Sequence, residues 1–101
     1  IRRAIDLGVT IFDTAERYAE GRSEEALGRI VGERSDMIVA SKYFPRKNDD
    51  GVDFSYKTIS GAVEASLSRL KRSVIDVYQI HSPRLDELEA QEWVEPLNRL
   101  K

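Results

Sequence analysis

The sequence of 101 residues contains no cysteine and only one histidine. Without cysteine there is no disulfide framework, no thiol nucleophile and no thiolate ligand for a metal ion. One histidine with one aspartate does not supply the three or more protein ligands of a catalytic zinc. We therefore expect no metal site.

Long apolar runs and an excess of one charge are also absent. No run approaches the ~18 apolar residues of a membrane-spanning helix, and no basic start precedes the apolar block of a signal peptide. The 16 Lys and Arg residues against 18 Asp and Glu give a formal net charge of −2, unlike the basic footprint of a nucleic-acid-binding protein. We expect a cytoplasmic globular protein that binds neither nucleic acid nor membrane.

Three short apolar runs predict β-strands, and each is followed by a helical pattern. The strands are expected at 9–13, 37–42 and 74–80, and helices at 1–8, 23–34, 55–71 and 85–100. This alternation is typical of right-handed βαβ units with a parallel sheet. Strand 9–13 is apolar on both sides, so we expect the sheet to be covered on both faces.

Local signals refine these boundaries. Gly8 is placed to end the first helix with a positive φ angle, and Ser23 is the expected N-cap of the second. The polar segment 46–53 has no apolar pattern and is predicted to be a surface loop. Pro96 interrupts the last helical region, which either kinks there or begins again near Glu95.

Residues suited to proton transfer follow the predicted strands. Asp13, Lys42 and His81 stand at the carboxyl ends of successive strands, and Tyr18 lies in the loop after the first. In a (β/α)₈ barrel such side chains converge on one mouth, where active sites are built. A lysine beside a tyrosine stabilises the phenolate, an aspartate holds the lysine, and a histidine can orient a substrate oxygen. Together they predict a general acid aimed at a carbonyl group.

Each of these residues also has a purely structural interpretation. His81 alone can be a hydrogen-bonded structural histidine, and Asp13 a helix cap or loop anchor. Lys42 with Asp13 can be a structural ion pair, and Tyr18 a packing residue. Their occurrence in order, at successive strand ends, favours the catalytic interpretation.

Three further aromatic residues lie near these positions. Tyr43 and Phe44 directly follow Lys42 and are candidates for lining a substrate pocket. Trp93 is expected to pack in the core of the last helical region.

Five motifs, in order along nearly the whole chain, resemble those of the aldo-keto reductases. They are F-D-T-A-x-x-Y at 12–18, S-E-x-x-L-G at 23–28, V-A-S-K at 39–42, S-L-x-R-L at 66–70 and I-D-x-Y-Q-I-H at 75–81. All four members of the family's catalytic tetrad have counterparts here, namely Asp13, Tyr18, Lys42 and His81. The family binds its cofactor without a Rossmann glycine fingerprint, and this sequence contains none.

The resemblance implies a (β/α)₈ barrel that reduces aldehydes or ketones with NADPH, by hydride transfer to the carbonyl carbon. Tyr18 would be the general acid, and Lys42 the partner that lowers its pKa. Asp13 would orient the lysine and lie near the nicotinamide ribose of the cofactor. His81 would orient the carbonyl substrate.

The resemblance also implies that residues 1–101 are an interior fragment of a single barrel domain. We expect about three consecutive βα units, without the later strands whose loops hold most of the cofactor, so the fragment alone should be inactive. An alternative is a non-catalytic partner protein, similar to the potassium-channel β subunits that keep the tetrad but sense a cofactor. The oligomeric state and the particular carbonyl substrate stay open.

Overall fold

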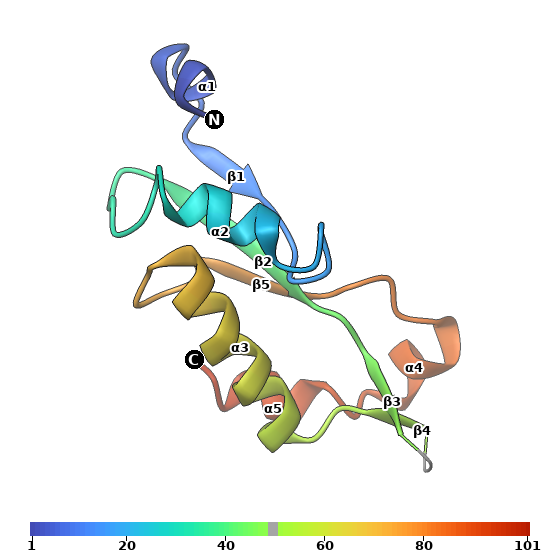
Figure 1. Ribbon diagram of the computed structural model, residues 1–101. Helices are drawn as coiled ribbons and strands as arrows, with labels where there is room; N and C mark the ends of the chain where they lie inside the picture. The colour runs from blue at the N-terminus through green and yellow to red at the C-terminus, as the bar shows by residue number, and fades with distance from the viewer. Residues whose placement is uncertain (49–50) are drawn as a thin grey trace.

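The computed structural model describes residues 1–48 and 51–101 (Figure 1). The helices are α1 (Arg2–Asp6), α2 (Arg22–Gly28), α3 (Tyr56–Leu70), α4 (Leu85–Ala90) and α5 (Val94–Asn98). The strands are β1 (Ile11–Asp13), β2 (Ile38–Tyr43), β3 (Arg46–Asn48), β4 (Gly51–Asp53) and β5 (Val77–Ile80). Within this part of the chain, no helix has the length and apolar character needed to cross a membrane.

The main sheet is parallel, with the strand order β1-β2-β5. Its register places Asp13 beside Ala40 and Lys42 beside Gln79. The predicted parallel sheet is therefore confirmed, although β5 is shorter than the predicted strand 74–80. Because β2 lies between the other two strands, the residues at its carboxyl end have neighbours on both sides.

One face of the sheet is covered by α2 and α3, which lie side by side over it (Figure 1). The core on this face contains the buried side chains of Leu27, Val31, Met37, Val39 and Leu70. A second cluster extends the core towards α5 and consists of Tyr43, Phe54, Ile59 and Ala62. Trp93 is partly buried against this second cluster, as predicted.

The opposite face of the sheet is open in the described part of the chain. Ile11, Ile38 and Val77 are 61%, 44% and 45% exposed. The prediction that the sheet is covered on both faces is therefore wrong for the described residues. Successive residues of a strand point to opposite faces of a sheet. Asp13 is two residues after Ile11, and Lys42 is four residues after Ile38, so both lie on this same open face.

Segment 46–53 contains a β-hairpin rather than an irregular loop. β3 and β4 pair antiparallel, with Lys47 opposite Val52; residues 49–50 of the predicted loop lie outside the described residues. The pairing uses backbone hydrogen bonds, which need no apolar pattern in the sequence. The hydroxyl of Tyr43 donates to the carbonyl of Asp53, which ties β4 to the main sheet.

The helix boundaries follow the predicted signals in part. Gly8 has φ 92° and follows the first helix as expected. Ser55 caps α3, since its side chain accepts from the backbone N–H of Thr58. The prediction that Ser23 caps the second helix is wrong: Gly21 with φ 87° is the N-cap, because the Ser23 hydroxyl is hydrogen-bonded elsewhere.

The last helical region consists of two helices. Gln91 has φ 55° and ends α4, and α5 then begins at Val94. Pro96 therefore lies in the first turn of α5, where a missing backbone N–H costs no intrahelical hydrogen bond. The expectation that a new helix begins near Glu95 is confirmed.

Candidate active site

The four predicted residues come from three adjacent strands and one loop. Asp13 is the last residue of β1, Lys42 the last but one of β2, and His81 directly follows β5. The backbone N–H of His81 donates to the carbonyl of Tyr43 at 2.8 Å, which extends the pairing of β5 with β2 by one residue. The parallel sheet therefore brings the three residues to the same edge.

The Lys42 ammonium is the centre of this edge. Its Nζ donates to Asp13 Oδ1 at 2.8 Å, to Asp13 Oδ2 at 2.7 Å and to the carbonyl of Thr14 at 2.7 Å. An ammonium group has three donors, so these contacts occupy its hydrogen-bonding capacity. The Lys42 side chain is only 12% exposed, whereas that of Asp13 is 56% exposed. The cation is thus fixed while the carboxylate faces the open side of the sheet.

Tyr18 lies over this ion pair from the turn that follows β1. Lys42 Nζ is 5.2 Å from the centroid of the Tyr18 ring, within the range of a cation–π contact. Tyr18 is 42% exposed, so it is open to a ligand. Two left-handed residues, Ala19 and Glu20 with φ 50° and 57°, reverse the chain directly after it.

His81 lies between two aromatic rings. Its ring centroid is 5.6 Å from that of Tyr18 and 5.7 Å from that of Phe44, both in edge-to-face geometry. The Nδ1 atom is buried without a hydrogen-bond partner among the described residues. The structure therefore brings together all four residues that the sequence predicts, while their catalytic roles stay predictions.

Glu16 contributes to this site, although sequence reasoning did not single it out. Its carboxylate accepts from the backbone N–H of Phe44 at 2.8 Å and from Arg46 at 2.9 Å. The Arg17 guanidinium lies 4.0 Å from the centroid of the Phe44 ring. Glu16 and Arg17 occupy the two unspecified positions of the F-D-T-A-x-x-Y motif. The motif therefore does not predict their contacts with Phe44 and Arg46.

The two aromatic residues after Lys42 have different environments. Tyr43 is fully buried in the core and packs against Phe54, with ring centroids 6.4 Å apart. Burial raises the pKa of the Tyr43 phenol. The interpretation of Tyr43 as a pocket-lining residue is therefore wrong, because alternation along β2 points it towards the helices. Phe44 lies against His81, with ring centroids 5.7 Å apart, and its role in lining a substrate pocket stays a prediction.

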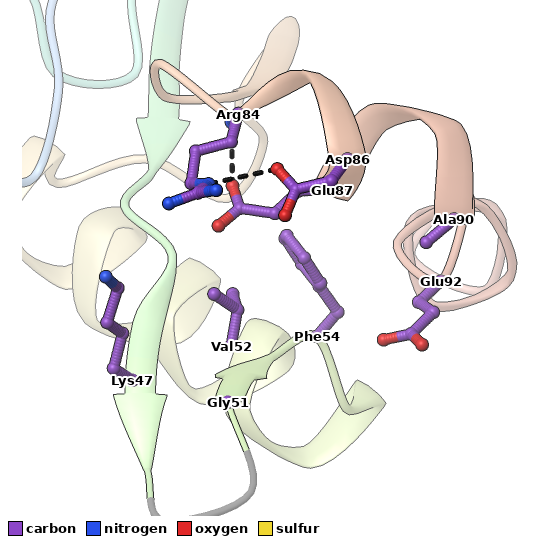
Figure 2. A pocket seen from close by; sticks show the side chains of 9 residues that line it. All are labelled: Lys47, Gly51, Val52, Phe54, Arg84, Asp86, Glu87, Ala90 and Glu92. Carbon is purple, nitrogen blue, oxygen red and sulfur yellow. Dashed lines mark hydrogen bonds and ion pairs between the residues drawn. The ribbon is translucent and has the colours of Figure 1, made fainter.

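A separate pocket of about 450 Å³ lies between the β3–β4 hairpin and α4 (Figure 2). Val52 and Phe54 form part of its wall, and it contains none of the four predicted site residues. Arg84 donates from its Nε to Asp86 at 2.9 Å and from its backbone N–H to Glu87 at 2.8 Å. The Glu87 contact satisfies the backbone N–H at the N-cap of α4, and the Asp86 contact is an ion pair between exposed side chains, so we assign these polar residues a structural role.

Comparison with known proteins identifies the family. The model of the Aldo/keto reductase family matches residues 1–100. The uncharacterized oxidoreductase YqkF of Bacillus subtilis is 39% identical over 103 residues, which cover 97% of this chain and 33% of the relative. A probable voltage-gated potassium channel subunit beta of Arabidopsis thaliana is 42% identical over 85 residues, covering 77% of this chain and 25% of the relative.

Solved structures agree with this relationship. An aldo-keto reductase from Klebsiella pneumoniae in complex with NADPH superposes with a TM-score of 0.77 and 33% identity, over 98% of this chain and 32% of that one. The chain therefore spans about a third or less of the length of these relatives. The described residues form part of a (β/α)₈ barrel, and the chain belongs to the aldo/keto reductase family of oxidoreductases.

Proposed function

We propose that the protein reduces aldehydes or ketones to alcohols with NADPH, and that Tyr18 is the general acid. Because the chain spans about a third of the relatives' length, this activity belongs to the full-length protein that carries it. The observation that supports the proposal most strongly is the position of the Lys42 ammonium. It is fixed by both oxygens of Asp13 and lies 5.2 Å from the Tyr18 ring.

This arrangement suits proton donation by a phenol. When Tyr18 gives its proton to the carbonyl oxygen of a substrate, a negative charge develops on the phenol oxygen. The nearby ammonium stabilises that charge, and its hydrogen bonds to Asp13 and Thr14 prevent it from turning away. A fixed cation stabilises the charge without reorganisation at the moment of reaction.

His81 is suited to orient the substrate oxygen. Its ring is held between Tyr18 and Phe44, so it turns only with difficulty. The backbone hydrogen bond to Tyr43 fixes the strand end that carries it. A ring placed in this way can donate a hydrogen bond to the same carbonyl oxygen that receives the proton.

The residues present fit the nicotinamide end of the cofactor. Asp13 stays 56% exposed although Lys42 occupies one side of its carboxylate, which leaves an oxygen surface for a ribose hydroxyl group. When bound, NADPH supplies the hydride to the carbonyl carbon. The Klebsiella pneumoniae structure, which contains NADPH, supports this assignment.

A single substitution tests the role of Tyr18. In the full-length protein, we expect Tyr18→Phe to lower NADPH oxidation with an aromatic aldehyde by about 100-fold or more, since general acid catalysis contributes ~10²- to 10⁴-fold. Tyr56→Phe is a matched control, because Tyr56 is the first residue of α3 and its ring stacks with the Arg99 guanidinium, which lies 3.8 Å from the ring centroid. Undiminished turnover in Tyr18→Phe would refute the role of general acid.

A second function is a non-catalytic partner protein that senses the cofactor. It is favoured by the 42% identity to a probable potassium channel subunit beta. This function predicts a stable complex with another protein on gentle purification and negligible turnover with any carbonyl substrate. Rapid turnover without a partner would exclude it.

A further inference from the structure

Two neighbouring residues of α2 contact the two strand ends that carry the ion pair. Ser23 Oγ shares a 2.8 Å hydrogen bond with Thr14 Oγ1. The next residue, Glu24, accepts a hydrogen bond from Ser41 Oγ. Thr14 directly follows Asp13, and Ser41 directly precedes Lys42. One helical turn therefore binds to β2 and to the residue that follows β1, each time next to a predicted catalytic residue.

Glu24 is a buried carboxylate with a cation beside it. It is fully buried, and its second oxygen accepts from Arg69 Nε of α3 at 2.7 Å. Arg69 also donates to Ser66 Oγ at 3.2 Å. Since an unpaired buried charge is costly, the pair with Arg69 keeps the Glu24 carboxylate in place. Ser41 is thus bonded to a rigid acceptor.

The contacts of Ser23 with Thr14 and of Glu24 with Ser41 can affect the Lys42 cluster only through the backbone of the two strand ends. Successive residues of a strand point to opposite faces, so Ser41 points to the helices while Lys42 points to the open face. The hydroxyl of Thr14 contacts Ser23, and its carbonyl accepts from Lys42 Nζ. A shift of either strand end would therefore move a donor or an acceptor of the Lys42 cluster.

We propose that Ser23 and Glu24 are positioning residues that set the geometry of the Asp13–Lys42 pair through Thr14 and Ser41. This inference rests on the proposed function, because it gives the pair a catalytic task. It also assigns a physical role to the S-E dipeptide of the S-E-x-x-L-G motif. In this proposal α2 fixes the carboxyl ends of β1 and β2 from the face of the sheet opposite to the Lys42 ammonium. The ammonium is thereby held at a constant distance from the phenol of Tyr18.

Two matched substitutions separate positioning from a general loss of stability. Ser41→Ala and Ser66→Ala each remove a fully buried hydroxyl bonded to the Glu24–Arg69 pair. Only Ser41 adjoins Lys42. In the full-length protein we expect Ser41→Ala to lower kcat for NADPH-dependent aldehyde reduction by about tenfold or more, since small displacements of catalytic groups have large effects. KM for NADPH should stay within about twofold of the wild-type value.

The control should behave differently. Ser66→Ala should retain wild-type kcat, although both variants should melt a few degrees lower because each loses a buried hydrogen bond. Ser23→Ala, which removes the contact with Thr14, should lower kcat in the same way as Ser41→Ala and provides the test if Ser41→Ala does not fold.

The outcomes distinguish this inference from the proposed function. Equal losses of kcat in Ser41→Ala and Ser66→Ala would overturn the positioning role, and so would wild-type kcat in both Ser41→Ala and Ser23→Ala. Neither outcome would contradict the proposed reduction of carbonyl substrates. Failure of the proposed function appears instead as wild-type turnover in Tyr18→Phe, whatever the serine variants do.

Discussion

Lys42 Nζ lies 2.7 Å from Asp13 Oδ2 although 29 residues separate the two in the sequence. The pairing of β1 with β2 makes this contact possible, because it places both side chains on the open face of the sheet, at its carboxyl edge. The carboxylate stays exposed and the ammonium does not. This asymmetry agrees with the roles proposed above, in which Asp13 lies beside the cofactor and Lys42 is a buried supporting cation.

Removal of the ammonium should stop catalysis without unfolding the protein. We expect Lys42→Met to lower turnover by about 100-fold or more, because the phenolate of Tyr18 would lose the cation that stabilises it. Lys57→Met, at an exposed position of α3, is the control and should keep wild-type turnover. Steady-state assays on the full-length protein check this. Equal activity of the two variants would contradict the role of Lys42.

Gly28 is predicted to tolerate no side chain. A Cβ at this position would overlap the carbonyl oxygen of Arg69 and lie 2.7 Å from that of Leu70, where α2 crosses α3. We expect Gly28→Ala to lower the free energy of unfolding by about 1–3 kcal/mol.

Gly61 provides the matched control for this substitution. It lies within α3, and a Cβ there would meet nothing within 4 Å. Gly61→Ala should raise the free energy of unfolding by about 0.5–1 kcal/mol, because alanine has the higher helix propensity. Urea denaturation measures both effects. A rise in the free energy of unfolding for Gly28→Ala as well would show that the helix packing at Gly28 is looser than described.

Loss of Arg69 should strongly destabilise the protein. Arg69→Met leaves the fully buried Glu24 carboxylate with only the Ser41 hydroxyl, which should cost about 3–5 kcal/mol of unfolding free energy. The double variant Glu24→Leu with Arg69→Met should lose less, since no uncompensated charge remains. Arg29→Met, at an exposed position of α2's C-cap, should change stability little. A loss in the double variant as large as in Arg69→Met would contradict this explanation.

Asp53 should make stability depend on pH in the acid range. Its carboxylate accepts from the Thr58 hydroxyl and the Ser55 backbone N–H, and these hydrogen bonds lower the Asp53 pKa. A lowered pKa means that the stabilisation is complete above the unfolded value of about 3.9 and is lost as pH falls through the folded value. The difference in urea midpoint between wild type and Asp53→Asn should be constant from about pH 5 to 7 and shrink below about pH 4. A difference that grows on acidification would contradict it.

The positions of Asp13, Lys42 and His81 could be predicted because strand alternation and strand ends are local patterns. A β-branched run followed by one polar residue predicts where that residue will stand in a parallel sheet. Tyr18 could be placed near them because its loop begins at the same edge. The alternation of strands and helices along the chain then predicts that these strand ends meet at one edge of a parallel sheet.

The positions of Ser23, Glu24 and Glu16 could not be predicted in the same way. Glu24 is bonded to Arg69, 45 residues away, and an acidic residue in a first helical turn usually faces solvent. Ser23 has the residue type of an N-cap, but tertiary contact with Thr14 prevails over that local preference. The β3–β4 hairpin was missed because backbone pairing leaves no apolar period.

Transfer of deuterium from NADPH to an aldehyde would show whether this site reduces a carbonyl group. The full-length protein is incubated with NADPH that carries deuterium at the transferable C4 position and with an aromatic aldehyde, and the alcohol is analysed by mass spectrometry. We expect an alcohol with one deuterium on the carbinol carbon from the wild type and from Tyr56→Phe, and the same product about 100-fold more slowly from Tyr18→Phe. An alcohol without deuterium, or equal rates in the two tyrosine variants, would contradict carbonyl reduction by this site.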